Sequence, residues 1–188
     1  MNTKPVICCI CILPLSILSF AESPADTLRS PVGASSPQVE STAEQRQRII
    51  RVTKVLEAQP FGESAAADRE WAISLIDHAP DIFPLIHGNK MYSQITEAQG
   101  PDRRALHTQF VFGFVSFQLE HPKQAGDSVA VYEAAIKSCL LIYRQARERN
   151  AANRVPFLDA ADEHERSGTL RRYVEQRVTE DLASQRSD

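Results

Sequence analysis

The stretch 159–166 holds the densest group of side chains that could take part in chemistry. On a helix, Asp159 and Glu163 lie on one face, because residues four positions apart are neighbours there. Carboxylates clustered beside an imidazole, here that of His164, can bind a cation or exchange protons with a substrate if one of them is partly buried. Asp159, Glu163 and His164 are therefore the candidate metal ligands, and the acidic cluster Asp159–Glu165 is the candidate centre of a hydrolase-like enzyme. The competing interpretation is a solvated helix face, the usual setting of a charged run.

The other four of the five histidines show no ligand spacing. His107 and His121 are fourteen positions apart on one expected helix, or about 21 Å at about 1.5 Å per residue, so they cannot share an ion. His78 and His87 have two prolines between them, and neither an HExxH nor a Glu-x-x-His motif occurs in the chain. We expect these histidines to be surface residues or to lie at helix ends.

The chain also lacks motifs for nucleophilic catalysis and for cofactor binding. The chain has no Gly-x-Ser-x-Gly elbow, no glycine-rich phosphate loop and no haem-attachment sequence. Cys139 lies on the apolar face of an expected helix, where a thiol behaves as a small hydrophobic group and not as a reactive thiolate. We expect no cofactor and favour a protein without catalytic activity.

The N-terminus, residues 1–21, has the layout of a secretory signal peptide. Lys4 precedes an apolar stretch, residues 6–18, and Ser19 and Ala21 place small residues at the −3 and −1 positions of a cleavage site. The apolar stretch is shorter than the about 20 residues that a spanning helix needs. The sequence therefore predicts export to the periplasm or the extracellular space, with only transient contact between the leader and the membrane. The alternative is an uncleaved leader that anchors a structural component of the envelope.

Cysteine content and charge limit how the exported chain can be held together and what it can bind. Three of the four cysteines lie in the predicted leader, so the processed chain keeps Cys139 alone and cannot form an internal disulfide. Its fold must therefore be stabilised by a hydrophobic core. The net charge of −3 gives no basic footprint for a nucleic acid. Residues 22–41 are rich in serine and proline, which predicts a flexible linker before a folded domain over residues 42–188.

Apolar residues recur at helical spacing along that domain. Ser41 and Glu44 have the spacing of a capping box at its start. Proline, glycine and capping residues divide the domain into segments expected at about 42–59, 64–79, 90–99, 101–120, 127–150, 156–166 and 169–184. We predict an all-α fold, a single irregular helical bundle of about five to seven helices.

Two neighbouring segments are expected to form the centre of the bundle. The segment 127–150 has a regular apolar face that suits near-antiparallel packing, made of Val129, Tyr132, Ile136, Cys139, Tyr143 and Ala146. Residues 109–119 are rich in phenylalanine and valine and could form a strand, but the chain offers no convincing second strand as a partner. A helix there would be buried on most sides, because it points four phenylalanines in several directions: Phe110, Phe112, Phe114 and Phe117.

These observations predict an exported helical protein that acts by binding. Because no catalytic motif is present, we expect a binding or protein-interaction module whose partner is a protein or a small apolar ligand in a groove between helices. The pattern specifies neither the identity of the partner nor the oligomeric state. The alternative is a metal-binding protein or hydrolase-like enzyme that uses the cluster Asp159–Glu165.

Overall fold

A computed structural model describes residues 40–82, 90–97 and 99–185 of the chain. The predicted signal peptide, nearly all of the predicted linker and His87 lie outside these residues. Two short 3-10 turns, η1 (Pro80–Ile82) and η2 (Pro122–Gln124), follow the second and fourth helices. The described residues form seven α-helices: α1 (Ala43–Ala58), α2 (Ala65–His78), α3 (Lys90–Thr96), α4 (Arg103–Glu120), α5 (Ser128–Arg149), α6 (Pro156–Arg166) and α7 (Leu170–Gln185).

The prediction of an all-α bundle is confirmed: across the described ranges the chain forms helices and turns but no strand. The ambiguous stretch 109–119 is part of α4 and is helical throughout. Among the helices that the structure describes, none combines the length and apolar character needed to cross a membrane.

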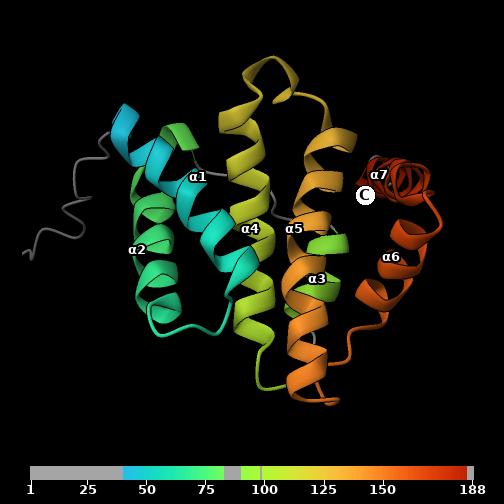
Figure 1. The fold of residues 1–188 in the computed structure, drawn as a ribbon. Helices are drawn as coiled ribbons and strands as arrows, with labels where there is room; N and C mark the ends of the chain where they lie inside the picture. Colours follow the sequence, from blue (N-terminus) through green and yellow to red (C-terminus); the bar gives the residue numbers. More distant parts are fainter. Residues whose placement is uncertain (1–39, 83–89, 98, 186–188) are drawn as a thin grey trace, which may run out of the picture. The chain divides into compact units, whose positions relative to one another are not determined.

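Figure 1 shows α4 and α5 side by side at the centre of the described fold, running in opposite directions. α1 packs against both of them, and α2 lies against α1 and α4. On the other side of α5, α6 and α7 pack on it and on each other, while α3 contacts α4 and α6. The hairpin of α4 and α5 therefore supports all the other helices of the described bundle.

α4 meets apolar side chains on two sides, which explains its apolar sequence. Phe110 and Phe114 belong to a core cluster that α4 forms with α3, α5, α6 and α7. Phe112 and Val115 belong to a second cluster, formed with α1, α2 and η1. The predicted spread of the phenylalanines is confirmed, and α4 separates two halves of the hydrophobic core.

The contact between α4 and α5 is tight at Gly113. A Cβ atom added to this glycine would lie 2.6 Å from the Cβ of Ser138 and 3.0 Å from the Cα of Ala135. Carbon atoms that are not bonded to one another do not pack this closely. The predicted apolar face of α5 is buried beside this point, from Tyr132 to Ala146. Glycine at position 113 therefore sets the separation of the two central helices.

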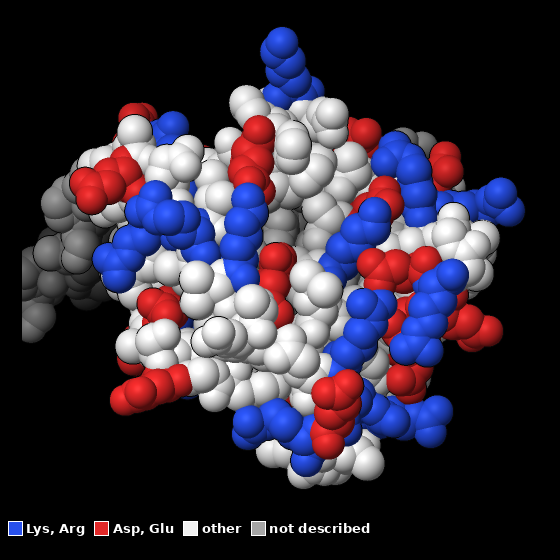
Figure 2. All heavy atoms as spheres, in the orientation of Figure 1, with Lys and Arg blue, Asp and Glu red and all other residues white. Residues whose placement is uncertain are grey.

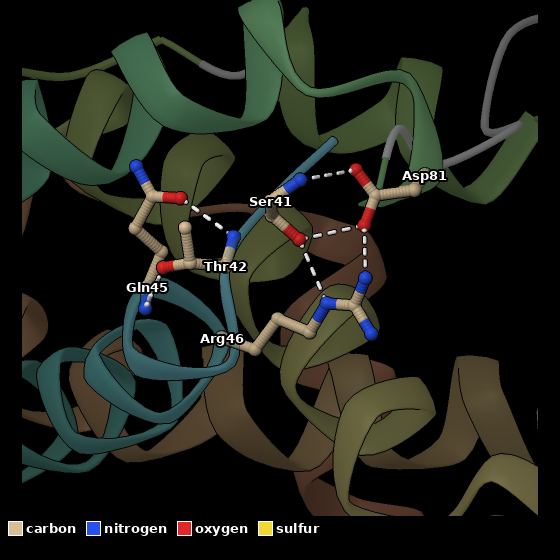
Figure 3. A network of polar contacts seen from close by, with 5 residues as sticks. All are labelled: Ser41, Thr42, Gln45, Arg46 and Asp81. Atoms are coloured by element: carbon tan, nitrogen blue, oxygen red, sulfur yellow. Dashed lines mark hydrogen bonds and ion pairs between the residues drawn. The ribbon is translucent and has the colours of Figure 1, made fainter. Parts of the chain in front are cut away.

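The start of α1 corrects the predicted capping box. The cap is Thr42: its hydroxyl accepts from the Gln45 backbone N–H at 3.1 Å, and the Gln45 side chain accepts from the Thr42 N–H at 2.7 Å. Ser41 is held instead by Asp81, to which its N–H donates at 2.8 Å and its hydroxyl at 2.6 Å (Figure 3). Arg46 donates a further hydrogen bond to each of these two residues. The box begins one residue later than predicted, because a carboxylate distant in the sequence engages Ser41.

Replacement of Gly113 by alanine should destabilise the protein. Overpacking of this kind lowers the free energy of unfolding by about 1–3 kcal/mol. The better helix propensity of alanine offsets up to about 1 kcal/mol of this loss. We expect Gly113→Ala to lower the free energy of unfolding by about 1–2 kcal/mol, measured as a lower urea midpoint at unchanged slope. Gly126→Ala is the matched control, since nothing lies within 4 Å of its added Cβ. An equal loss in both variants would contradict the close helix contact.

The Asp81 contacts predict a contribution to stability that acid removes. Burial raises the pKa of Asp81, but hydrogen bonds from Ser41 and the charge of Arg46 lower it more, so that the net pKa lies below the ordinary value. A carboxyl with a lowered folded-state pKa stabilises the protein above its unfolded pKa of about 3.9. That stabilisation is lost as the pH falls through the folded-state value.

Asp81→Asn should therefore lower the free energy of unfolding at neutral pH by about 1 kcal/mol, a modest loss because the Arg46 side chain is 43 % exposed. The difference from the wild type should shrink between about pH 5 and about pH 2, as the wild-type carboxylate takes up its proton. Urea unfolding across this range measures the effect, with Glu175→Gln on the exposed face of α7 as the control. A difference that persists at low pH would exclude the Asp81 charge as its source.

Candidate functional site

Asp159, the first of the three candidate metal ligands, is held by hydrogen bonds from other side chains of the protein. Its carboxylate accepts hydrogen bonds from the Tyr143 hydroxyl at 2.6 Å and from Arg154 Nε at 2.8 Å. Burial raises the pKa of Asp159, yet these two donors lower it more, so the net pKa lies below the ordinary value. The group is therefore a fixed carboxylate, charged at neutral pH, and a poor proton donor.

Glu163 and His164 do not complete a ligand set with Asp159. Glu163 is exposed, whereas His164 stacks on the Tyr173 ring with the ring centroids 4.4 Å apart. The His164 Nδ1 atom lies 2.8 Å from the Thr169 hydroxyl. Within the part of the chain that the structure describes, no group of three or more His, Cys, Asp and Glu side chains is placed to hold a metal ion.

The rest of the acidic cluster is paired with arginine. Arg144 of α5 donates from Nε to Asp162 at 2.7 Å and also contacts Glu165. Arg166 lies 2.5 Å from the other Asp162 oxygen. This arrangement fits an ion-paired helix face better than a cation site, because guanidinium groups already compensate the carboxylates. The geometry gives no support to the metal-binding or hydrolase-like alternative.

Cys139 has the buried position that the sequence predicts. Its side chain is fully buried on α5, and its Sγ donates to the Leu106 carbonyl at 3.4 Å. Burial raises the pKa of the thiol, so the nucleophilic thiolate is disfavoured. Cys139 packs as a core residue.

Of the four histidines expected at the surface or at helix ends, His87 lies outside the described residues, His78 and His121 follow the prediction, and His107 does not. His78 ends α2 with its Nδ1 2.6 Å from the Ser74 carbonyl oxygen, and the exposed His121 caps the C-terminus of α4. His107 differs, because it is half-buried between α3 and α4 and contacts the Tyr92 hydroxyl. No pattern in the sequence predicts this pair, because its members come from separate helices.

A buried polar network joins α1, α4 and α5, and the sequence pattern missed it. The Gln109 side chain is fully buried, and its amide donates to the Ser138 hydroxyl at 2.8 Å. Ser138 donates in turn to Glu57 at 2.6 Å. The network contains a hydroxyl and a carboxylate but no imidazole that could act as the base of a catalytic triad. It fixes the register of the three helices.

A hollow lies where the turn between α1 and α2 meets the C-terminal end of α5. We call it the turn surface; its volume is about 500 Å³, and it is lined by Ala58, Gln59, Pro60, Phe61, Gly62, Gln145, Glu148 and Arg149. The half-buried Phe61 has the Arg149 guanidinium 4.2 Å from its ring centroid. Gln145 joins α5 to the last turn of α1 by donating to the Glu57 carbonyl at 3.0 Å. Figure 2 shows mainly uncharged atoms over this part of the face, with charged side chains around them.

A second hollow shares Phe61 with the turn surface. Its volume is about 290 Å³, and the start of α4 forms its far wall, including Asp102 and Arg104. Arg69 of α2 lines it as well and is held by the carbonyl oxygens of Pro60 and Ala65. Phe61 therefore presents ring surface to two adjoining depressions of mixed polarity.

No family model, curated protein or solved structure matches this chain. Its function is therefore inferred from its own residues.

Cys139 should resist thiol reagents until the protein unfolds. In a chain with Cys8, Cys9 and Cys11 changed to serine, a maleimide should label Cys139 only at urea concentrations that unfold the core. An added cysteine at Leu182, which is 49 % exposed, serves as the control and should be labelled at once in the folded protein. Rapid labelling of Cys139 in native buffer, measured by mass spectrometry, would contradict its burial.

Proposed function

We propose that the protein is an exported, non-catalytic helical binding module that holds a protein segment or a small apolar ligand at the turn surface. The observation that carries this proposal is the position of Phe61. An aromatic ring is half-buried between two depressions at one end of the bundle, and its exposed edge is available to a partner.

The composition of the turn surface supports a binding role. A volume of about 500 Å³ lies in the range of small-molecule sites, about 300–1,000 Å³. Aromatic and arginine side chains, here Phe61 and Arg149, are enriched at the energetic centres of interfaces. The Gln59 and Gln145 amides provide neutral donors and acceptors beside the ring, which suit the backbone of a peptide partner.

The absence of catalysis is proposed because the groups that could react are engaged in the fold. Asp159 and Asp162 are compensated by arginines, and Cys139 is buried in the core. We also propose that residues 1–21 direct export and are removed after Ala21, leaving the protein in the periplasm or the extracellular space. Mass spectrometry of the N-terminus in the producing cell tests this step, because retention of Met1 to Ala21 would mean an anchored protein.

A photo-crosslinking amino acid at Gln59 should capture a partner through the turn surface. Gln59 is exposed and lines the hollow, whereas Gln176 is also exposed but lies on α7 and does not line the hollow. We expect a discrete crosslinked product from position 59, identified by mass spectrometry, and none of the same mass from position 176. Products of identical mass and yield at both positions, or none at position 59, would contradict binding at this surface.

Two variants test whether the crosslink from position 59 reflects a specific site or nonspecific binding. Phe61→Ala should reduce the yield of the crosslink from position 59 by about tenfold or more, which is the effect of losing about 1.4 kcal/mol at a central contact. Leu182→Ala removes a side chain that is 49 % exposed on α7 and should leave the yield unchanged. Circular dichroism of both variants checks that the helices remain intact.

A further inference from the structure

The second hollow beside Phe61 contains two arginine side chains that could bind an anion. We call it the arginine hollow; it is lined by Phe61, Ala66, Arg69, Glu70, Pro101, Asp102, Arg104 and Ala105. Among the residues that the structure describes, neither Arg69 nor Arg104 forms an ion pair. Arg104 is exposed at the start of α4, whereas Arg69 of α2 is half-buried. The two guanidinium groups therefore enter the hollow from different helices.

The half-buried Arg69 is incompletely satisfied by its neighbours. It donates to the Pro60 carbonyl oxygen and, at 3.5 Å, to the Ala65 carbonyl oxygen. Its buried Nε has no acceptor in the described part of the chain. Carbonyl oxygens carry no net charge, whereas a buried positive charge is normally paired with an anion. The described fold therefore leaves this guanidinium group without a directly bound counter-ion.

Two carboxylates line the hollow, but neither provides that counter-ion. Asp102 accepts from Asn153 Nδ2 at 2.7 Å, and its N–H donates to Asn153 Oδ1 at 3.0 Å, so Asn153 holds it in place. Burial lowers the pKa of Arg69, and the more distant charge of Asp102 offsets only part of this change. Glu70 is exposed and opposes an incoming anion. A ligand must therefore gain its affinity from direct contact with the guanidinium groups.

We propose that the arginine hollow binds a carboxylate of the partner, and that the partner is a protein segment with an acidic side chain or a C-terminal carboxylate next to an apolar residue. Guanidinium groups bind carboxylates through parallel N–H···O hydrogen bonds, which here would come from Arg69 and Arg104. This inference rests on the proposed binding of a partner at Phe61.

The position of Phe61 connects the two hollows. Its ring lines both the turn surface and the arginine hollow, so a segment that crosses the ring reaches both. The arginine hollow has a volume of about 290 Å³, near the lower end of small-molecule sites, and suits a single residue. Its apolar part consists of Phe61, Ala66 and Ala105, which can contact the carbon atoms beside the carboxylate. The ligand is therefore expected to combine a negative charge with an apolar group.

Two small probes test the recognition of the charge. 3-Phenylpropionate and its amide have nearly the same shape, but only the first carries a carboxylate. In titrations of the full chain followed by NMR of the arginine Nε–H signals, we expect the acid to bind about tenfold or more tightly than the amide, because charge-assisted hydrogen bonds are the stronger ones. The saturable shifts should include Arg69 and Arg104. Equal affinities for the two probes, or no saturable binding of the acid, would overturn the proposal.

Three variants assign the binding to the arginine hollow. Arg104→Gln should weaken binding of 3-phenylpropionate by about fivefold or more, whereas Arg103→Gln changes an exposed neighbour outside the lining and should have little effect. Glu70→Gln removes a like charge and should tighten binding by about twofold, which a loss of structure would not do. All three positions are exposed, and circular dichroism checks that the helices remain intact. Equal affinities of the Arg104→Gln and Arg103→Gln variants would overturn the site.

The crosslink from position 59 separates this inference from the proposed function. Arg104→Gln should lower its yield by about fivefold or more, and Arg103→Gln should leave it unchanged. If the wild type gives the crosslink and Arg104→Gln keeps it in full, this inference is wrong while binding at the turn surface stands. If 3-phenylpropionate binds through Arg104 but the wild type gives no crosslink, the ligand is a free small carboxylate, and the assignment to a protein segment is wrong together with the proposed function.

Discussion

The close approach of α4 and α5 at Gly113 is the constraint on which the rest of the structure depends. A hydrogen atom in place of a side chain lets Ala135 and Ser138 sit against the backbone of α4. Every other described helix packs on one of these two. Since Cys139 is free and buried, non-covalent packing must hold the described bundle together.

The hydrogen bonds and ion pairs of the polar side chains mainly hold helices to one another. Arg144 joins α5 to α6 through two carboxylates, and Gln109 and Ser138 join α4, α5 and α1 in the core. Such contacts pair charged groups and connect polar groups of different helices, which favours one arrangement of the helices. The turn around Phe61, whose ring is incompletely covered, is the surface at which we propose that a partner binds.

Sequence periodicity predicted the helices well, because a helix that buries one face has apolar residues three and four positions apart. It also predicted that Cys139 would be buried and that the phenylalanines of α4 would point in several directions. Contacts between distant segments could not be predicted in this way. Ser41 does not form the expected capping box because it is hydrogen-bonded to Asp81, and His107 contacts the Tyr92 hydroxyl. The turn surface was not predicted either, because a single aromatic residue in a turn forms no periodic pattern in the sequence.

The attachment of Ser41 has a mechanical consequence. A pull transmitted along the chain from the preceding residues would first meet the three hydrogen bonds that Ser41 makes with Asp81 and Arg46. Because Asp81 belongs to η1, beyond the end of α2, and Arg46 to the first turn of α1, the load would be shared between these two elements. Ser41 would therefore distribute a force on the described chain over two elements before the cap at Thr42 has to carry it.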